Sequence, residues 1–183
     1  MNQEEILECI KDVFTFACID FLESLGCNSP QLVGLNANHD EDLVSLIDAG
    51  GDCVDLSMAL SLPNSILSMT YPVGSSSADA IVGIDDDALE DWASEISNRL
   101  IGSIKTTLAS HNFDVLIGIP STSFGIPAED VITNHGNPIK LTFDVDGLYL
   151  TILFDVELFE ESSKFNPNPV EVEAIDEGEL EFF

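Results

Sequence analysis

Basic residues are scarce in this chain of 183 residues, which has 5 lysines and arginines against 34 aspartates and glutamates. The formal net charge is −29 at pH 7. A surface of this charge repels phosphate backbones and anionic lipid, so we expect neither a nucleic-acid partner nor a membrane partner. Solubility or a salty cytoplasm explains the acidity most simply, and attraction to a basic partner surface is the alternative.

Long apolar runs are also missing, because no stretch approaches the roughly 18 uninterrupted apolar residues that a membrane span requires. Residues 1–14 lack the basic and apolar regions of a signal peptide, and we therefore expect a cytoplasmic protein. Hydrophobic residues make up 45% of the chain, which at this length predicts one ordinary domain with a proper core.

Signatures of metal, nucleotide and hydrolase sites are absent as well. The cysteines lack CxxC spacing and the histidines are scattered, so we expect reduced, mostly buried thiols and no metal site. The cysteines are Cys9, Cys18, Cys27 and Cys53. The sequence has no P-loop, no G-x-G-x-x-G loop and no G-x-S-x-G elbow, which leaves nucleotide binding and serine hydrolysis without support.

Two long amphipathic helices are the clearest elements. Apolar residues recur at helical spacing over 3–25, and Gly26 is a plausible end for this first helix. The aspartates at 85–87 supply a cap and a negative first turn for the second helix, which should end near His111. Its apolar face consists of Leu89, Trp92, Ala93, Ile96, Leu100, Ile104 and Leu108.

The rest of the chain predicts short strands and connections. Strands are expected at 32–35, 43–47, 54–62, 115–119 (buried), 139–145 and 148–159. The expected connections are a turn at 49–52, a short helix at 63–71, loops at 74–78 and 121–138, and a hairpin turn at 146–147. Apolar residues at every even position from 148 to 158 indicate a half-buried strand. A long helix followed by strands occurs twice, which could reflect two similar halves, although their residues do not match.

The end of the chain differs in composition from the rest. Beyond Phe159 it holds eight acids and one lysine among Asn, Pro and Ser residues. We interpret 160–183 as a largely flexible acidic tail and 1–159 as the folded domain. The expected fold class is α/β of the α+β type, with two long helices packed on a largely antiparallel sheet.

The outward face of the second helix carries Asp91, Glu95, Asn98, Gly102 and Lys105. The glutamate and the asparagine are one turn apart and project together. A glycine inside a helix costs about 1 kcal/mol relative to alanine, and here it leaves a flat spot against which another chain could dock. A solvated helix surface is the simplest interpretation of these residues, and a functional site is the other.

The helix from Glu95 to Leu108 resembles the signature helix of the CheX/CheC chemotaxis phosphatases, in which E-x-x-N is followed by a glycine and a lysine. The proline- and glycine-bearing segment 117–125 resembles the one that comes next in that family, and 42–63 resembles its first hairpin. The order of elements agrees over roughly residues 3–159.

The resemblance implies a CheC-like fold and a phosphatase that removes the phosphoryl group from the phosphoaspartate of a CheY-type receiver domain, in chemotaxis or related two-component signalling. It implies that Asn98 holds a water in line with the phosphorus and that Glu95 pairs with the receiver's lysine. Asp91, Gly102 and Lys105 would form the docking face. We expect no cofactor of the chain's own, because the Mg²⁺ would come with the receiver. A side-chain amide can donate and accept at once, which suits the orientation of a water.

Two features depart from that pattern. CheC-like members usually carry two E-x-x-N helices, but the first helix here offers only Glu8-Cys9-Ile10-Lys11, so we expect a single-site, CheX-like protein. The net charge opposes approach to an acidic receiver pocket unless salt screens it. The alternative is a non-catalytic module that docks on a receiver or only dimerises. CheX relatives pair by strand exchange, for which the 148–158 strand would be the candidate edge in a homodimer.

Overall fold

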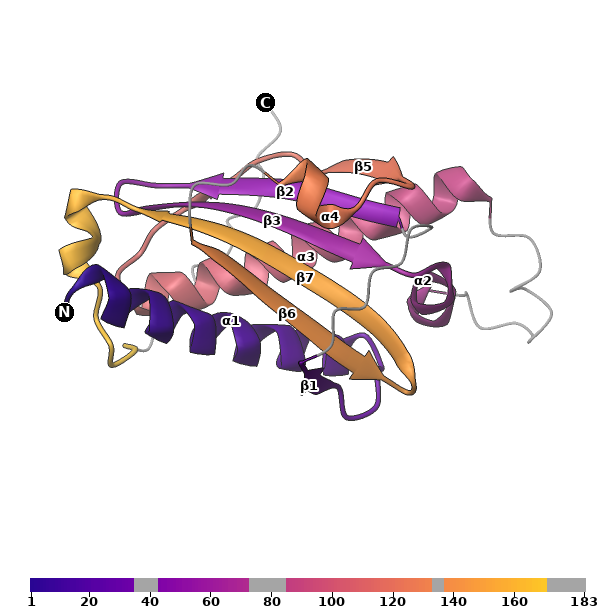
Figure 1. Cartoon of the computed structure of the whole chain (residues 1–183), viewed down its shortest axis with the longest axis horizontal. Helices are drawn as coiled ribbons and strands as arrows, with labels where there is room; N and C mark the ends of the chain where they lie inside the picture. The colour runs from indigo at the N-terminus through magenta and orange to yellow at the C-terminus, as the bar shows by residue number, and fades with distance from the viewer. Residues whose placement is uncertain (35–42, 73–84, 133–136, 171–183) are drawn as a thin grey trace, which may run out of the picture.

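The computed structural model describes residues 1–34, 43–72, 85–132 and 137–170, and it has two long helices and an antiparallel sheet (Figure 1). The helices are α1 Gln3–Ser24, α2 Asn64–Thr70, α3 Asp86–Ser110, α4 Ala128–Val131 and the 3₁₀ turn η1 Glu160–Lys164. The strands are β1 Gln31–Val33, β2 Leu43–Gly50, β3 Val54–Leu62, β4 Leu116–Ile117, β5 Ser121–Phe124, β6 Pro138–Val145 and β7 Leu148–Leu158. The predicted α+β class is confirmed.

The sheet has seven strands in the order β1-β6-β7-β3-β2-β4, and β5 also pairs with β2. Every pairing is antiparallel. The two long hairpins, β2–β3 and β6–β7, meet where β3 pairs with β7 at the centre. Each hairpin is flanked by a short strand from the other half of the chain, since β1 pairs with β6 and β5 pairs with β2. The repeated order of elements therefore corresponds to two interlocked halves.

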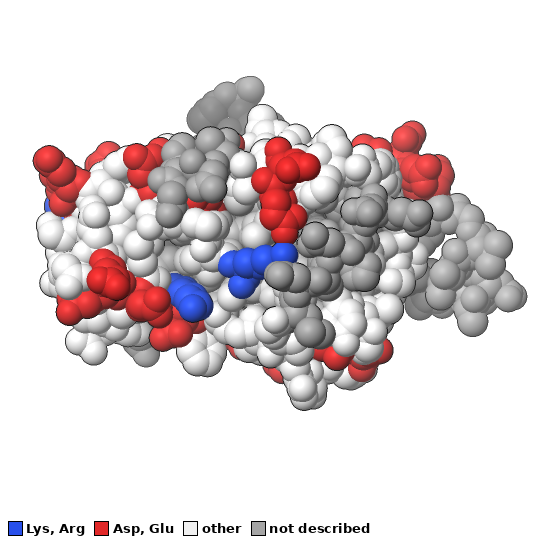
Figure 2. Space-filling view, in the orientation of Figure 1, with Lys and Arg blue, Asp and Glu red and all other residues white. Residues whose placement is uncertain are grey.

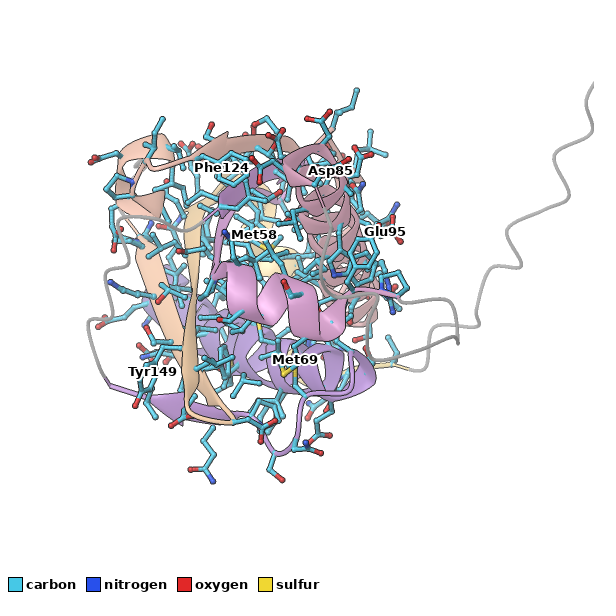
Figure 3. All side chains as sticks on the ribbon, turned by 90° about the vertical axis from the view of Figure 1, so that its right-hand side faces the viewer. Met58, Met69, Asp85, Glu95, Phe124 and Tyr149 are labelled. Carbon is cyan, nitrogen blue, oxygen red and sulfur yellow. The ribbon has the colours of Figure 1, made fainter. Side chains whose placement is uncertain are left out.

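Both long helices cover the same face of the sheet, as Figure 3 shows, and α4 lies on the other face. The main core fills the layer between the helices and the sheet. In it the ring centroid of Phe14 in α1 lies 4.5 Å from that of Phe154 in β7. A smaller apolar cluster joins Ala128 of α4 to Val44, Ala59 and Leu153 on the opposite face.

α1 and α3 end in the same backbone motif. The amide of Cys27 donates to the carbonyl of Leu22 at 3.1 Å after α1, and the amide of Phe113 donates to the carbonyl of Leu108 at 2.9 Å after α3. Both are the six-to-one bonds of a Schellman motif, which requires a left-handed residue before the donor. Gly26 (φ 88°) and Asn112 (φ 68°) occupy that position.

Two turns in the sheet depend on glycine. The β6–β7 hairpin turns through Asp146 (φ 54°) and Gly147 (φ 83°), the pair of positive φ angles that a type I′ turn requires. At the β2–β3 turn a Cβ on Gly51 would lie 2.0 Å from the carbonyl oxygen of Asp114, so only glycine fits there. Both hairpins were predicted from the sequence, and both are confirmed.

The segment after α3 differs from its prediction. The expected buried strand 115–119 is a two-residue strand at the edge of the sheet, and Leu116 and Ile119 have 79% and 92% of their surface exposed. The expected loop 121–138 contains β5 and α4. The run of apolar residues predicted a buried strand, but β4 is the outermost strand in the sheet order and pairs with β2 at Leu116 and Ile117.

β7 also differs from its prediction. Its residues from Leu150 to Val156 are buried, on both faces of the sheet. It pairs with β3 on one side and with β6 on the other. The predictions of a half-buried strand and of a free edge at 148–158 are therefore wrong for this chain.

The segment beyond Phe159 packs against the end of α3 as far as Val170. Phe165 is buried, and its ring stacks on that of His111 with centroids 5.0 Å apart. The amide of Asn166 donates to the carbonyl of His111 at 2.9 Å, and the amide of Val170 donates to the carbonyl of Ser110 at 3.0 Å. The prediction of a flexible tail is wrong for 160–170.

Some sequence-based expectations lie outside the described residues, namely the strand position at Leu35, the loop at 74–78 and the tail from 171 onward. No helix in the part of the chain that the structure describes is both long and apolar enough to cross a lipid bilayer.

Candidate functional site

The five residues singled out on the second helix share the outward face of α3. Asp91, Glu95 and Asn98 are exposed, and Gly102 and Lys105 are half-buried. Figure 3 shows Glu95 directed away from the sheet. The opposite side of α3 is buried, including every position predicted for its apolar face. The structure therefore brings these residues to one surface, in the order in which they occur along the helix.

The first half of α3 is fixed by a cap and by a tertiary contact to α2. Asp85 caps the helix, because its Oδ1 accepts from the amide of Ala88 at 2.8 Å. The indole Nε1 of Trp92 donates to Oγ1 of Thr70 in α2 at 3.1 Å, and Trp92 is buried as predicted. These contacts hold the turn that precedes Glu95.

Contacts to β5 and to the C-terminal segment complete the support. Oγ1 of Thr122 in β5 donates to Oε2 of Glu90 at 3.2 Å. At the other end His111, the C-cap of α3, lies 2.7 Å through Nδ1 from the carbonyl oxygen of Asn166. A side chain on this helix is thus presented from a rigid element, as positioning chemistry requires.

The outward face offers a carboxylate and an amide one turn apart, with little bulk beside them. An added Cβ at Gly102 would meet no atom within 4 Å, so the surface is open there. The amide of Asn98 can donate to one group while it accepts from another, and Glu95 can accept from a cation. The face can therefore bind a water and a positively charged partner group at the same time.

Two features near the site were not found from the sequence. The guanidinium carbon of Arg99 lies 5.8 Å from the ring centroid of Phe21 in α1, within the range of a cation–π contact. On the buried side, Oγ of Ser97 makes no hydrogen bond to any described residue. The scarcity of bases in the sequence could have drawn attention to Arg99, but its contact across two helices is a tertiary feature.

A hollow of about 580 Å³ lies at the C-terminal end of α3. Lys105 and Lys164 both line it, together with the β2–β3 turn and the chain from 112 to 116. Lys164 belongs to η1 and forms an ion pair with Glu161. The hollow thus joins the outward face of α3 to the C-terminal segment.

The described residues contain no group of three or more potential metal ligands among their His, Cys, Asp and Glu side chains. The cysteines are free thiols, three of them buried and Cys9 half-buried. Burial raises the pKa of the Cys18 thiol far above its ordinary value, because the thiolate would lose its hydration. This thiol is a core residue rather than a nucleophile.

The sequence matches no protein-family model, and no curated protein matches it. The structure does have counterparts. A chemotaxis protein CheX from Vibrio vulnificus aligns with a TM-score of 0.64 and 19% identity, over 80% of this chain and 95% of that one. A CheC-like superfamily protein from Shewanella sp. PV-4 aligns with a TM-score of 0.61 and 18% identity, over 86% of this chain and 99% of that one.

A third counterpart was solved together with a partner. It is CheX from Borrelia burgdorferi, in a CheX–CheY–BeF₃–Mg²⁺ complex, with a TM-score of 0.56 and 18% identity over 80% of this chain and 96% of that one. At such identities the likeness establishes the fold. The protein therefore has the fold of the CheX- and CheC-like chemotaxis proteins, which the resemblance in the sequence predicted.

Proposed function

We propose that this protein is a phosphatase for the phosphoaspartate of a CheY-type receiver domain, with its site on the outward face of α3. The observation that carries the proposal is the exposure of Glu95 and Asn98 together, one turn apart on a rigidly held helix of a CheX-type fold. The complex of a CheX with CheY, BeF₃ and Mg²⁺ supports a receiver as the partner.

The chemistry requires little of this chain. Phosphoryl transfer depends mainly on positioning and on neutralisation of charge, and a Mg²⁺ ion of the receiver would supply the latter. Asn98 would orient the attacking water, since its amide can accept a hydrogen bond from the water and donate one to a receiver atom. Glu95 would pair with a lysine of the receiver and so set the approach of the helix. Asp91, Gly102 and Lys105 would contact the partner around these two.

The test is phosphate release from a phosphorylated CheY-type receiver with Mg²⁺, with and without this protein. We expect acceleration by the wild type and a loss of at least about 100-fold of that acceleration in Asn98→Ala, since loss of an oriented reactant has an effect of this size. Asp12→Ala, which truncates an exposed polar side chain on α1, is the control and should act as wild type. Acceleration that persists in Asn98→Ala would contradict the proposed site.

The second candidate is a non-catalytic module that docks on a receiver through the same face. The net charge of −29 motivates it, because long-range repulsion from an acidic partner slows the repeated encounters that turnover requires. The Asn98→Ala variant distinguishes the two functions. If the wild type binds a BeF₃-activated receiver but releases no phosphate, and Asn98→Ala binds equally well, the protein only docks.

We also propose a homodimer, but through the sheet edge formed by β4 and β5 rather than through β7. β7 is paired on both sides, whereas β4 and β5 pair only with β2 among the described strands. The exposed apolar residues Leu116, Ile119 and Phe124 lie in this region. Size determination in solution, with Ile119→Asp as the interface variant, distinguishes a dimer through this edge from a monomer.

A further inference from the structure

The charge of α3 changes sign along the helix. Its first part, 86–95, contains five acids and no base. Its second part, 96–110, contains no acid and two of the five bases of the chain, Arg99 and Lys105. Asn98 lies at the start of the cationic part and Glu95 at the end of the acidic one, so the candidate site sits at the boundary.

The helix dipole does not account for this division. A dipole favours cations only within about the last turn of a helix, and the last turn of α3 holds no base. α1 provides the internal comparison, since it ends with Asp20 and Glu23 in its second half and likewise has no base in its last turn. The protein therefore does not place cations at helix ends as a rule.

Both cations of α3 are available to a partner. Arg99 is one turn from Glu95, yet no ion pair joins them, because the guanidinium lies over Phe21 of α1 instead. Lys105 forms no ion pair with a described residue and lines the hollow of about 580 Å³ at the end of the helix. Lys164 of η1 also lines that hollow, as do Asp52 and Asp114, and Lys164 is paired with Glu161, so among the described residues the unpaired cations of the surface are those of α3.

An aspartyl-phosphate site that works with Mg²⁺ is necessarily rich in carboxylates, because Mg²⁺ takes oxygen ligands. The sheet face of this protein, drawn in Figure 2, shows acidic side chains in many places and basic ones in few. A partner with an acidic rim is therefore repelled by this face, and the net charge of −29 repels it from the molecule as a whole. The second half of α3 carries two cations and no acid, so the net repulsion would be weakest there.

We propose that the α3 surface from Ile96 to Ser110, with Arg99 braced on Phe21 and Lys105 at the hollow, receives the acidic rim of the phosphorylated receiver and sets the direction in which α3 lies across it. This inference rests on the proposed function. It adds Arg99 as a docking residue, and it explains how a chain of net charge −29 approaches an acidic partner.

The experiment measures the dissociation constant of the full chain for a CheY-type receiver held active by BeF₃ and Mg²⁺, over a series of salt concentrations. Charge reversal in Arg99→Glu or Lys105→Glu should weaken binding about 10-fold or more at low salt, and the loss should shrink as salt screens the contact. Arg99→Lys and Lys105→Arg keep the charge and should stay near the wild-type affinity.

The control is Lys11→Glu, which makes the same change in net charge at an exposed position of α1. It should weaken binding less than about 2-fold, because it lies outside the proposed surface. Equal losses in all three reversals would mean that only the net charge matters, and unchanged binding in both α3 reversals would mean that these cations make no contact. Either result overturns the inference.

Phosphate release by wild type and Asn98→Ala, measured with the same receiver, separates this inference from the function on which it rests. Acceleration that depends on Asn98 together with unaltered binding of the two α3 reversals overturns the inference and leaves the phosphatase standing. A wild-type chain that neither binds nor accelerates overturns both. Circular dichroism of each variant confirms that the fold is retained.

Discussion

α1 and α3 occupy equivalent places in the two halves of the fold, but they present different outward faces. Each lies on the same face of the sheet, each is capped by a side chain at its start, and each ends in a Schellman motif. The outward face of α1 has acids along its whole length, whereas that of α3 changes from acids to bases at Glu95 and Asn98. The two helices thus share their structural role, and only α3 carries the residues of the proposed site.

This difference shows that the buried and exposed sides of the two helices are subject to separate requirements, packing on one side and site chemistry on the other. Packing on the sheet requires apolar residues at helical spacing, which both helices have. Site chemistry requires particular polar residues on a surface that is otherwise free to vary. Three variants of α1 and its neighbourhood test this separation.

The largest effect is expected from the buried side of α1. Phe14→Ala should lower the free energy of unfolding by about 3–5 kcal/mol, since the ring is 1% exposed and packs on Phe154. Phe16→Ala is the matched control on the same helix, because Phe16 is 68% exposed, and it should change stability by less than about 0.5 kcal/mol. Denaturant unfolding measures both, and similar costs would mean that α1 is not packed as described.

A smaller effect is expected at the motif that ends both helices. Gly26→Ala should cost about 1 kcal/mol, because an L-residue resists the left-handed conformation. An added Cβ at Gly26 would meet no atom within 4 Å, so the cost is conformational rather than steric. Gly26→Asn, which copies the residue at the end of α3, should cost less than half as much. Equal costs for alanine and asparagine, again by denaturant unfolding, would show that the two helix ends are not equivalent.

The smallest effect is expected when the motif alone is copied onto α1. Lys11→Asn produces the E-x-x-N spacing with Glu8, but Glu4, Glu5 and Asp12 surround it with negative charge that repels a phosphoryl group. In the Asn98→Ala background, phosphate release should stay at the receiver's own rate. Recovered release would mean that the spacing suffices on any exposed helix and would break the comparison.

Much of the fold could be predicted because its signals are local. The two long helices, the hairpins and the cap at Asp85 depend on periodicity, on turn residues and on side chains a few positions away. The segment 115–131 was not predicted correctly, because Leu116, Ile119 and Phe124 are exposed at a sheet edge and the short strands β4 and β5 depend on pairing with the distant β2. The packing of 160–170 was not predicted either, because it depends on distant residues: Phe165 contacts His111 and Phe113 at the end of α3.

The outward face of α3 was determined by the sequence alone, because Asp91, Glu95, Asn98, Gly102 and Lys105 share a face by helix geometry once the helix forms. The tertiary structure decided what lies around that face. Arg99 contacts Phe21 of α1, and Lys105 lines a hollow together with Lys164 of η1, although these residues are far apart in the chain. Helical order follows from interactions a few residues apart, whereas the surroundings of a surface depend on which distant elements pack beside it.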